Sequence, residues 1–92
     1  MILQINFFAT FRKVTGNKQY DYQGSVENIK ELLLELSDNF GTEFREMVLV
    51  GEELSPEVII LVNGINIEHL AQEETELNDK DKVSIFPVVA GG

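Results

Sequence analysis

The chain has 92 residues, of which 43% are hydrophobic and 25% are charged, the composition of a single globular domain. It carries 7 basic and 16 acidic side chains, a net charge of −9, so phosphate backbones and anionic membrane surfaces repel it. We therefore expect protein partners, with no nucleic acid and no membrane. The lack of cysteine excludes disulfides, thiolate nucleophiles and cysteine–metal sites.

The sequence also predicts a cytoplasmic protein. Residues 1–6 show neither the basic region nor the cleavage site of a signal peptide. The longest aliphatic run, Val58–Val62, is too short to span a bilayer.

The first elements are predicted from the spacing of apolar residues. Leu3, Ile5 and Phe7 alternate with polar residues, which is typical of a half-buried strand. A turn cluster follows at residues 15–17, and residues 19–23 predict a second strand that forms a hairpin with the first.

One amphipathic helix is predicted after the hairpin. Ser25 occupies the position of an N-cap, Glu27 lies in the first turn, and Gly41 is a C-terminal stop. The apolar positions recur at three- and four-residue spacing, at Val26, Ile29, Leu33, Leu36 and Phe40. We expect this stripe to pack against a sheet, because a helix this short needs packing to be stable.

The second half of the chain predicts three further strands. Residues 43–50 favour a short helix, and the run Val58–Val62 predicts a strand that is covered on both faces or lies centrally. The Asn63-Gly64 turn leads into a short returning strand. Residues 83–86 predict the last strand, which Pro87 ends.

This order of elements predicts an α+β protein with the β-grasp, or ubiquitin-like, fold, in which a mixed sheet packs on one main helix. The first and last strands would pair in parallel, with the helix in the crossover between them. We assign residues 1–87 to this domain and residues 88–92 to a flexible C-terminal tail. The expected core comprises Ile5, Ile29, Leu33, Leu36, Val58, Ile60 and Val83.

Few side chains suggest chemistry of their own. His69 is the only histidine, so no histidine pair can build a metal site, and no phosphate-cradling or dinucleotide fingerprint is present. The last residues, Gly91 and Gly92, have no Cβ atoms. One interpretation is a thin strip that threads a narrow channel in a partner and presents a carboxylate there, and the other is a frayed end.

The start and the end of the chain resemble the small subunit of molybdopterin synthase, MoaD, and the related ThiS-like ubiquitin-like sulfur carriers. The positions that carry this resemblance are Phe7, Phe8, Ala9, Arg12, Gly16, Leu77, Asp79, Asp81, Val83 and residues 85–92. Residues 61–64 and 66–68 are similar to archaeal-type members, which overlap with the small archaeal modifier proteins. Two positions depart from the family pattern, because Val88 replaces a usual second proline and Lys13 replaces a usual glutamate.

The resemblance implies a protein cosubstrate, the small subunit of molybdopterin synthase, with no stand-alone catalysis. A ubiquitin-activating-type enzyme would adenylate the Gly92 carboxylate with ATP, and a sulfur donor would displace AMP to leave a thiocarboxylate. Inside the large subunit of molybdopterin synthase, the tail would give this sulfur to a pterin precursor. The chain itself would bind no cofactor and no metal, since the activating partner uses the ATP and the sulfur donor.

The resemblance also assigns residues to partner binding. Phe8 and Phe86 should point outward, because each follows an inward-facing residue, and their rings would dock partners; ordinary core packing is the alternative. Arg12 would pair with an acid of the partner, or else be a solvated loop arginine. The tail positions that would enter the partner are Pro87, Val88, Val89, Ala90, Gly91 and Gly92.

Three other functions stay open at this stage. The same adenylate could lead to an isopeptide bond between Gly92 and lysines of target proteins, which would make the chain a protein modifier. The sulfur could be delivered to thiazole or to tRNA instead of molybdopterin. A ubiquitin-like module that only binds partners is the third alternative, and the terminal glycine pair argues against it.

Overall fold

The main sheet is built around a parallel pair made by its first and last strands. The computed structural model describes residues 1–88, and the strand order of this sheet is β2-β1-β7-β5-β6. The strands are β1 (Ile2–Phe7), β2 (Gln19–Gln23), β5 (Val58–Val62), β6 (Ile65–Asn66) and β7 (Lys82–Pro87). β1 runs parallel to β7, with Ile5 opposite Val83, while the other pairs in the sheet are antiparallel.

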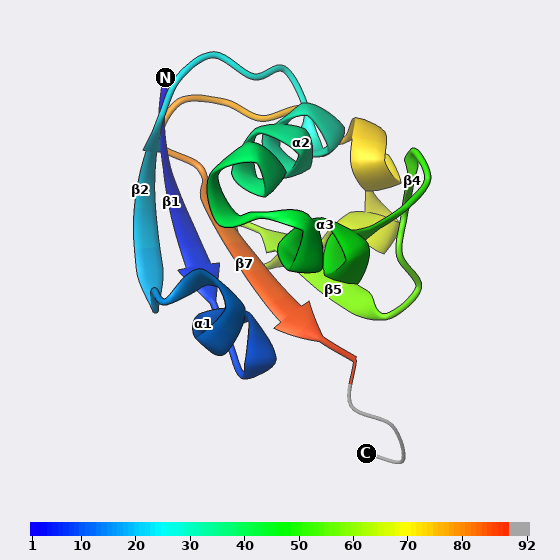
Figure 1. Cartoon of the computed structure of the whole chain (residues 1–92). Helices are drawn as coiled ribbons and strands as arrows, with labels where there is room; N and C mark the ends of the chain where they lie inside the picture. The colour runs from blue at the N-terminus through cyan, green and yellow to red at the C-terminus, as the bar shows by residue number, and fades with distance from the viewer. Residues whose placement is uncertain (89–92) are drawn as a thin grey trace.

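Helices cover one face of this sheet (Figure 1). They are α1 (Thr10–Thr15), α2 (Ile29–Phe40) and α3 (Thr42–Val48). The short elements are the hairpin of β3 (Leu49–Val50) and β4 (Glu53–Leu54) and the 3₁₀ turns η1 (Ile67–His69) and η2 (Gln72–Glu74). Because α2 lies in the crossover between two parallel strands, the predicted β-grasp fold is confirmed. None of the helices within residues 1–88 has the length and apolar character needed to cross a membrane.

The hydrophobic core lies between the sheet and α2, as predicted. Leu3, Ile5 and Phe7 of β1 are fully buried and alternate with more exposed residues. Leu33 and Leu36 of α2 are fully buried on the facing side. All seven residues that the sequence predicted for the core belong to one buried cluster.

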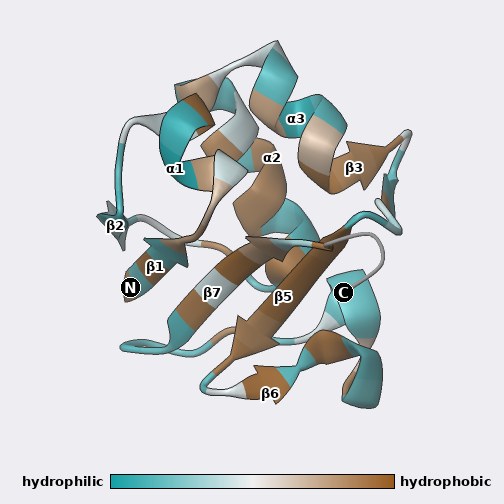
Figure 2. Ribbon diagram, turned by 90° about the horizontal axis from the view of Figure 1, so that it is seen from below, coloured by the Kyte–Doolittle hydropathy of each residue, from teal (hydrophilic) through white to brown (hydrophobic). Residues whose placement is uncertain are grey.

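Strand β5 lies inside the sheet, between β7 and β6. Figure 2 shows this strand as hydrophobic along its whole length. Val58, Ile60 and Val62 are buried, while Ile59 and Leu61 on the opposite face are half-buried. The predicted interior position is confirmed, and the predicted cover on both faces is not found within residues 1–88.

The main helix begins later than the sequence predicted. Its N-cap is Asn28, whose side chain accepts a hydrogen bond from the Glu31 backbone N–H at 2.9 Å, so the prediction of Ser25 is wrong. The preceding segment stays extended because Leu77 donates its N–H to the Glu27 carbonyl at 3.0 Å. A contact distant in sequence thus decides which of two good capping residues is used.

A short helix, α1, fills a region for which the sequence predicted only a turn. Phe11 is 1% exposed and packs edge to face on Phe44 of α3, with ring centroids 5.9 Å apart. Gly16 ends α1 in the left-handed region at φ 73°, so the predicted turn cluster is the end of this helix. The sequence missed α1 because its 6 residues are too few to show a helical period.

We predict that Leu33→Ala lowers the free energy of unfolding by about 2–5 kcal/mol, because a fully buried side chain leaves a cavity. Urea denaturation followed by circular dichroism measures the loss. Leu70→Ala is the matched control, since Leu70 is 46% exposed, and it should cost about 0.5 kcal/mol or less. Equal losses in the two variants would contradict the core assignment.

A tyrosine–carboxylate pair ties the edge strand β2 to α2. The hydroxyl of the buried Tyr22 donates a hydrogen bond to the Glu35 carboxylate. Gly24 permits this position of the ring, because a Cβ at residue 24 would lie 2.3 Å from the Tyr22 oxygen. Burial, helped by the hydrogen bond to Glu35, raises the pKa of Tyr22 from its usual 10.0 to about 12.

We predict that stability falls between pH 10 and pH 12, because ionised Tyr22 is disfavoured by burial and cannot donate to Glu35. A raised pKa means that this stabilisation is complete below pH 10 and is lost as the pH rises through about 12. Urea denaturation across this range should show a smaller decline for Tyr22→Phe than for the wild type. The control Tyr20→Phe keeps Tyr22 and should decline like the wild type. Three equal declines would show that Tyr22 does not cause the pH dependence.

Candidate functional site

The parallel register brings two aromatic side chains from opposite ends of the sequence into contact. Phe8 donates its N–H to the Ile85 carbonyl at 3.1 Å, which extends the β1–β7 pairing beyond β1. The rings of Phe8 and Phe86 stack with centroids 4.2 Å apart and planes 7° from parallel. Each ring is partly exposed and follows a fully buried residue, so both lie on the sheet face opposite α2. The structure shows the predicted outward orientation, and their role in partner binding stays a prediction.

Arg12 of α1 lies over the Phe8 ring of this aromatic pair. Its guanidinium carbon lies 5.2 Å from the centre of the Phe8 ring, and its Nε donates to the Phe7 carbonyl at 2.8 Å. We call Arg12, Phe8 and Phe86 the aromatic stack. Arg12 forms no ion pair with a carboxylate within residues 1–88. Arg12 is exposed, but it lies in a helix and not in a loop, and it contacts a ring and a carbonyl. Its pairing with an acid of a partner stays a prediction.

Aliphatic side chains continue the apolar surface beside the aromatic stack. Ile59 lies opposite Phe86 in the β5–β7 register, and Leu61 lies two residues further along the same face. We call Phe8, Ile59, Leu61 and Phe86 the sheet-face patch. Asn6, the next residue of β1 on this face, is polar. The patch therefore reaches its greatest width near the end of β7 from which the tail leaves.

The charges of the chain are segregated along the sequence. All 16 side-chain carboxylates lie within residues 21–81, so residues 1–20 carry only the basic side chains Arg12, Lys13 and Lys18. Two of these belong to α1, and the Lys18 carbonyl bonds to the N–H of Phe7 at 2.9 Å. Of these three residues, Arg12 is placed at the aromatic stack by its contacts with Phe8 and Phe7. Its charge would complement an acidic side chain of a partner.

The root of the tail is still part of the sheet. Val88 donates its N–H to the Glu57 carbonyl at 2.9 Å, one step beyond the pair of Val58 and Pro87. Pro87 has no N–H to donate. At this position an N–H would point toward β1, but β1 has already ended there, so no hydrogen bond of the sheet is lost. Pro87 therefore ends the pairing with β1 and not the pairing with β5, which corrects the sequence prediction. The ladder holds Val88 without the proline that is usual at this position.

The remaining tail residues lie outside the described part of the chain. These are Val89, Ala90, Gly91 and Gly92, and their predicted roles stay predictions. Val88 is 47% exposed and directly follows β7, the strand that carries Phe86 of the sheet-face patch. Figure 1 shows the end of β7 from which the chain leaves the sheet. A partner that takes up the tail must therefore approach the end of the sheet that carries this patch.

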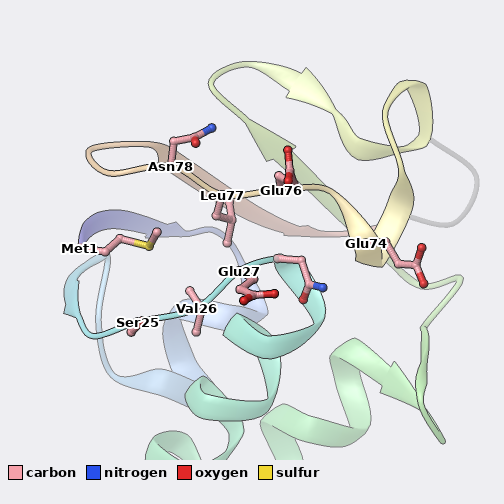
Figure 3. A pocket seen from close by; sticks show the side chains of 9 residues that line it. Met1, Ser25, Val26, Glu27, Glu74, Glu76, Leu77 and Asn78 are labelled. Atoms are coloured by element: carbon pink, nitrogen blue, oxygen red, sulfur yellow. The ribbon is translucent and has the colours of Figure 1, made fainter.

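Two hollows lie at opposite ends of the sheet. One of about 360 Å³ is at the root of the tail, and its lining residues are Thr10, Phe11, Met47, Glu57, Pro87 and Val88. The other, of about 690 Å³, surrounds Met1 at the far end (Figure 3). The carboxylates of Glu27, Glu74 and Glu76 line this second hollow without converging. Within the described residues, no group of three or more histidine, cysteine, aspartate or glutamate side chains is placed to hold a metal ion.

Sequence reasoning missed two parts of this site. One is the helix that carries Arg12, for which Gly16 as a C-terminal stop was the available signal. The other is the contribution of Ile59 and Leu61 to the sheet-face patch. Their positions in an uninterrupted aliphatic run are indistinguishable from core positions until the opposite face of the strand is known.

Known proteins share this fold over nearly the whole chain. The small archaeal modifier protein 1 from Methanosarcina acetivorans is 32% identical and has a TM-score of 0.82, covering 99% of this chain and 96% of that chain. Small archaeal modifier protein 3 from Haloferax volcanii is 37% identical over 100% of both chains. A protein of Archaeoglobus fulgidus named "Putative sulfur carrier protein" is 39% identical over 76% of this chain and 86% of its own length.

The fold and these relatives define a class, the ubiquitin-like β-grasp sulfur carriers and modifiers. Residues 5–92 match the ThiS family, and the chain belongs to it. The resemblance and the fold predicted from the sequence are therefore confirmed. The family match includes the four tail residues that the structure does not describe.

We predict that Phe8→Ala and Phe86→Ala each weaken binding to a ubiquitin-activating-type enzyme by about tenfold or more, because exposed aromatic residues commonly anchor interfaces. Loss of one stacked ring should lower the free energy of unfolding by only about 1–2 kcal/mol. Calorimetric titration measures the affinities. Ile65→Ala is the control, since Ile65 is 51% exposed on the far edge strand β6. Wild-type affinity in both aromatic variants, or unfolding of both, would contradict the docking role.

Proposed function

We propose that this protein carries sulfur for molybdopterin biosynthesis and that Gly92 is its reacting residue. A ubiquitin-activating-type enzyme brings the Gly92 carboxylate to ATP, the carboxylate oxygen attacks the α-phosphate, and pyrophosphate leaves. A donor of sulfide-level sulfur attacks the carbonyl carbon of the resulting acyl-adenylate, AMP leaves, and loss of a proton leaves Gly92 as a thiocarboxylate. The large subunit of molybdopterin synthase then takes up the tail, the sulfur passes to a pterin precursor, and water restores the Gly92 carboxylate.

Activation by a separate enzyme is required by the chemistry of the tail. A terminal carboxylate is an anion at neutral pH, and an anion is a poor electrophile. The adenylate removes this charge and supplies a good leaving group, and the sulfur that replaces oxygen is a better nucleophile. In this scheme the folded domain supplies position, and the partner supplies the ATP site and the sulfur donor.

The main observation behind the proposal is that one end of the sheet carries both the root of the tail and the sheet-face patch. The hydrogen bond from Val88 to Glu57 continues the β5–β7 ladder to the last described residue, so the sheet fixes the direction of the chain as far as Val88. Phe86 lies two residues before Val88 and contributes its ring to the patch. A partner that binds the patch would therefore receive the tail in a fixed direction.

The charge distribution supports the same mode of docking. Arg12 lies over the Phe8 ring of the sheet-face patch, and residues 1–20 contain no carboxylate side chain. An acidic rim around the tail channel of the partner would accelerate association and fix the orientation. Lys13 replaces a glutamate that is usual in the family, so this chain adds to the basic character at that position.

Protein modification through Gly92 is the second candidate function. It starts from the same adenylate, but the amine of a target lysine attacks the Gly92 carbonyl carbon, an amide bond forms and AMP leaves. The likeness to small archaeal modifier protein 3 over the whole of both chains favours this candidate. Delivery of sulfur to thiazole or to tRNA would use the same thiocarboxylate with another acceptor.

We predict that deleting Gly91 and Gly92 abolishes pyrophosphate release by the activating enzyme and leaves thermal melting nearly unchanged. Folding should lose little, because the buried core of the described residues 1–88 ends at Ile85. Chemistry fails because the reacting carboxylate must lie within bonding reach of ATP, where a shift of about 1 Å already costs roughly a hundredfold in rate. Undiminished pyrophosphate release from the deletion variant would overturn both candidate functions.

Two further variants distinguish the position of the terminal carboxylate from the type of residue that carries it. Gly92→Ala keeps the length and adds one methyl group, so its loss should be smaller than that of the deletion. One extra residue after Gly92 keeps both glycines but displaces the carboxylate, and it should be as damaging as the deletion. Mass spectrometry after reaction with the activating enzyme and a sulfur donor distinguishes the candidates, because a carrier exchanges oxygen for sulfur and a modifier becomes joined to a lysine.

A further inference from the structure

The outer edge of β2 carries backbone groups that no other described segment covers. β2 is the last strand of the sheet and pairs only with β1. The hydrogen bonds from Phe7 N–H to the Lys18 carbonyl and from Gly24 N–H to the Met1 carbonyl show which residues face β1. In an antiparallel pair these residues alternate with residues that face away. The backbone N–H and C=O groups that point outward therefore belong to Gln19, Asp21 and Gln23.

A preformed groove runs beside this edge, between β2 and α2. It encloses about 260 Å³, and the rings of Tyr20 and Tyr22 form part of its lining. Both rings are fixed to α2, because the Tyr20 hydroxyl accepts a hydrogen bond from Asn39 Nδ2 at 2.7 Å and Tyr22 donates to Glu35. A strand added to the β2 edge would direct alternate side chains into this groove.

Both faces of the edge carry negative charge. Asp21 is exposed at the centre of β2 on the sheet face opposite the groove, and Asp38 is exposed at the rim of the groove. Lys18 precedes β2 and Lys30 lies in α2, and the residues between them, 19–29, contain no lysine or arginine. The charge complement of this edge is therefore an extended segment with a basic residue at its centre.

A second copy of the chain fits this edge poorly. Antiparallel pairing of two β2 edges about their centre would place Asp21 directly opposite Asp21 of the other copy, and like charges in that position are destabilising. Each copy would also bring a net charge of −9. The edge thus disfavours self-association and leaves its backbone groups available to a basic partner.

We propose that the β2 edge is a strand-addition site for an extended basic segment of a partner protein. The segment pairs antiparallel with Gln19, Asp21 and Gln23, places a lysine or arginine opposite Asp21, and lays the two flanking apolar side chains on Tyr20 and Tyr22. The tail leaves from β7, two strands away, at about 10 Å across the sheet. One partner can therefore hold the edge while another handles the tail, and the site goes beyond the proposed function because it requires no reaction at Gly92.

The probe for this site is the acetylated and amidated peptide Lys-Val-Lys-Val-Lys, titrated into the ¹⁵N-labelled full chain. We expect the amide signals of Gln19, Asp21 and Gln23 to shift and to gain protection from hydrogen exchange, while that of Val88 does not change. Two N-methylated peptides test the backbone pairing. In antiparallel addition the lysine N–H groups face β2, so methylating them should weaken binding at least tenfold, whereas methylating the valine N–H groups should not. Equal binding of the two methylated peptides would overturn the proposal.

Charge variants test the role of Asp21. Asp21→Lys should weaken binding of the basic peptide about tenfold and favour Glu-Val-Glu-Val-Glu. Glu68→Lys makes the same change in net charge at an exposed residue of η1, next to the opposite edge strand β6, and should leave the affinity unchanged. Equal weakening in both variants would show that the peptide responds only to the net charge of the chain, and it would overturn the proposal. If the amide signals of Gln19, Asp21 and Gln23 shift with protein concentration in the absence of peptide, the edge binds a second copy of the chain. That result would also overturn the proposal.

Discussion

The parallel pairing of β1 with β7 is the constraint on which the rest of this molecule depends. Parallel strands cannot be joined by a hairpin, so the chain must cross over between them, and α2 lies in that crossover. The buried residues of the two strands, such as Ile5 and Val83, give α2 a surface on which to pack. The same register places Phe8 beside Phe86 on the other face. One pairing thus creates both the core and the candidate docking surface.

Different regions of the molecular surface carry different chemical features. The end of β7 combines an apolar patch, the Arg12 guanidinium and the root of the tail, so the proposed function would place docking and reaction at one end of the sheet. The β2 edge combines open backbone groups with negative charge. The hollow around Met1 lies far from the tail. This separation allows a small domain to be held by one protein while a second acts on its tail.

The sequence predicted elements whose pattern is set by burial and missed those set by distant contacts. The alternation of β1 and the stripe of α2 follow directly from which face meets the core. Asn28 displaced Ser25 as N-cap because Leu77 holds the preceding segment extended, and no local rule contains that contact. Pro87 can be part of β7 because the neighbouring strand β1 has already ended there. The sequence does not show this, because it does not show which strand lies beside β7. The glycine pair by itself indicated either a strip that threads a partner or a frayed end. Its chemistry came from the resemblance, and its roles stay predictions.

The stack of Phe8 on Phe86 also bears on the order of folding. Its two rings come from strands that are far apart in sequence, and long-range pairings form slowly because a large loop must close first. The β1–β2 hairpin can form early, but a lone hairpin is only marginally stable, and Phe8 then has no partner ring. The complete stack exists only once β7 has entered the centre of the sheet. A partner that binds the stacked rings of Phe8 and Phe86 would therefore bind fully folded molecules and not chains in which the sheet is incomplete.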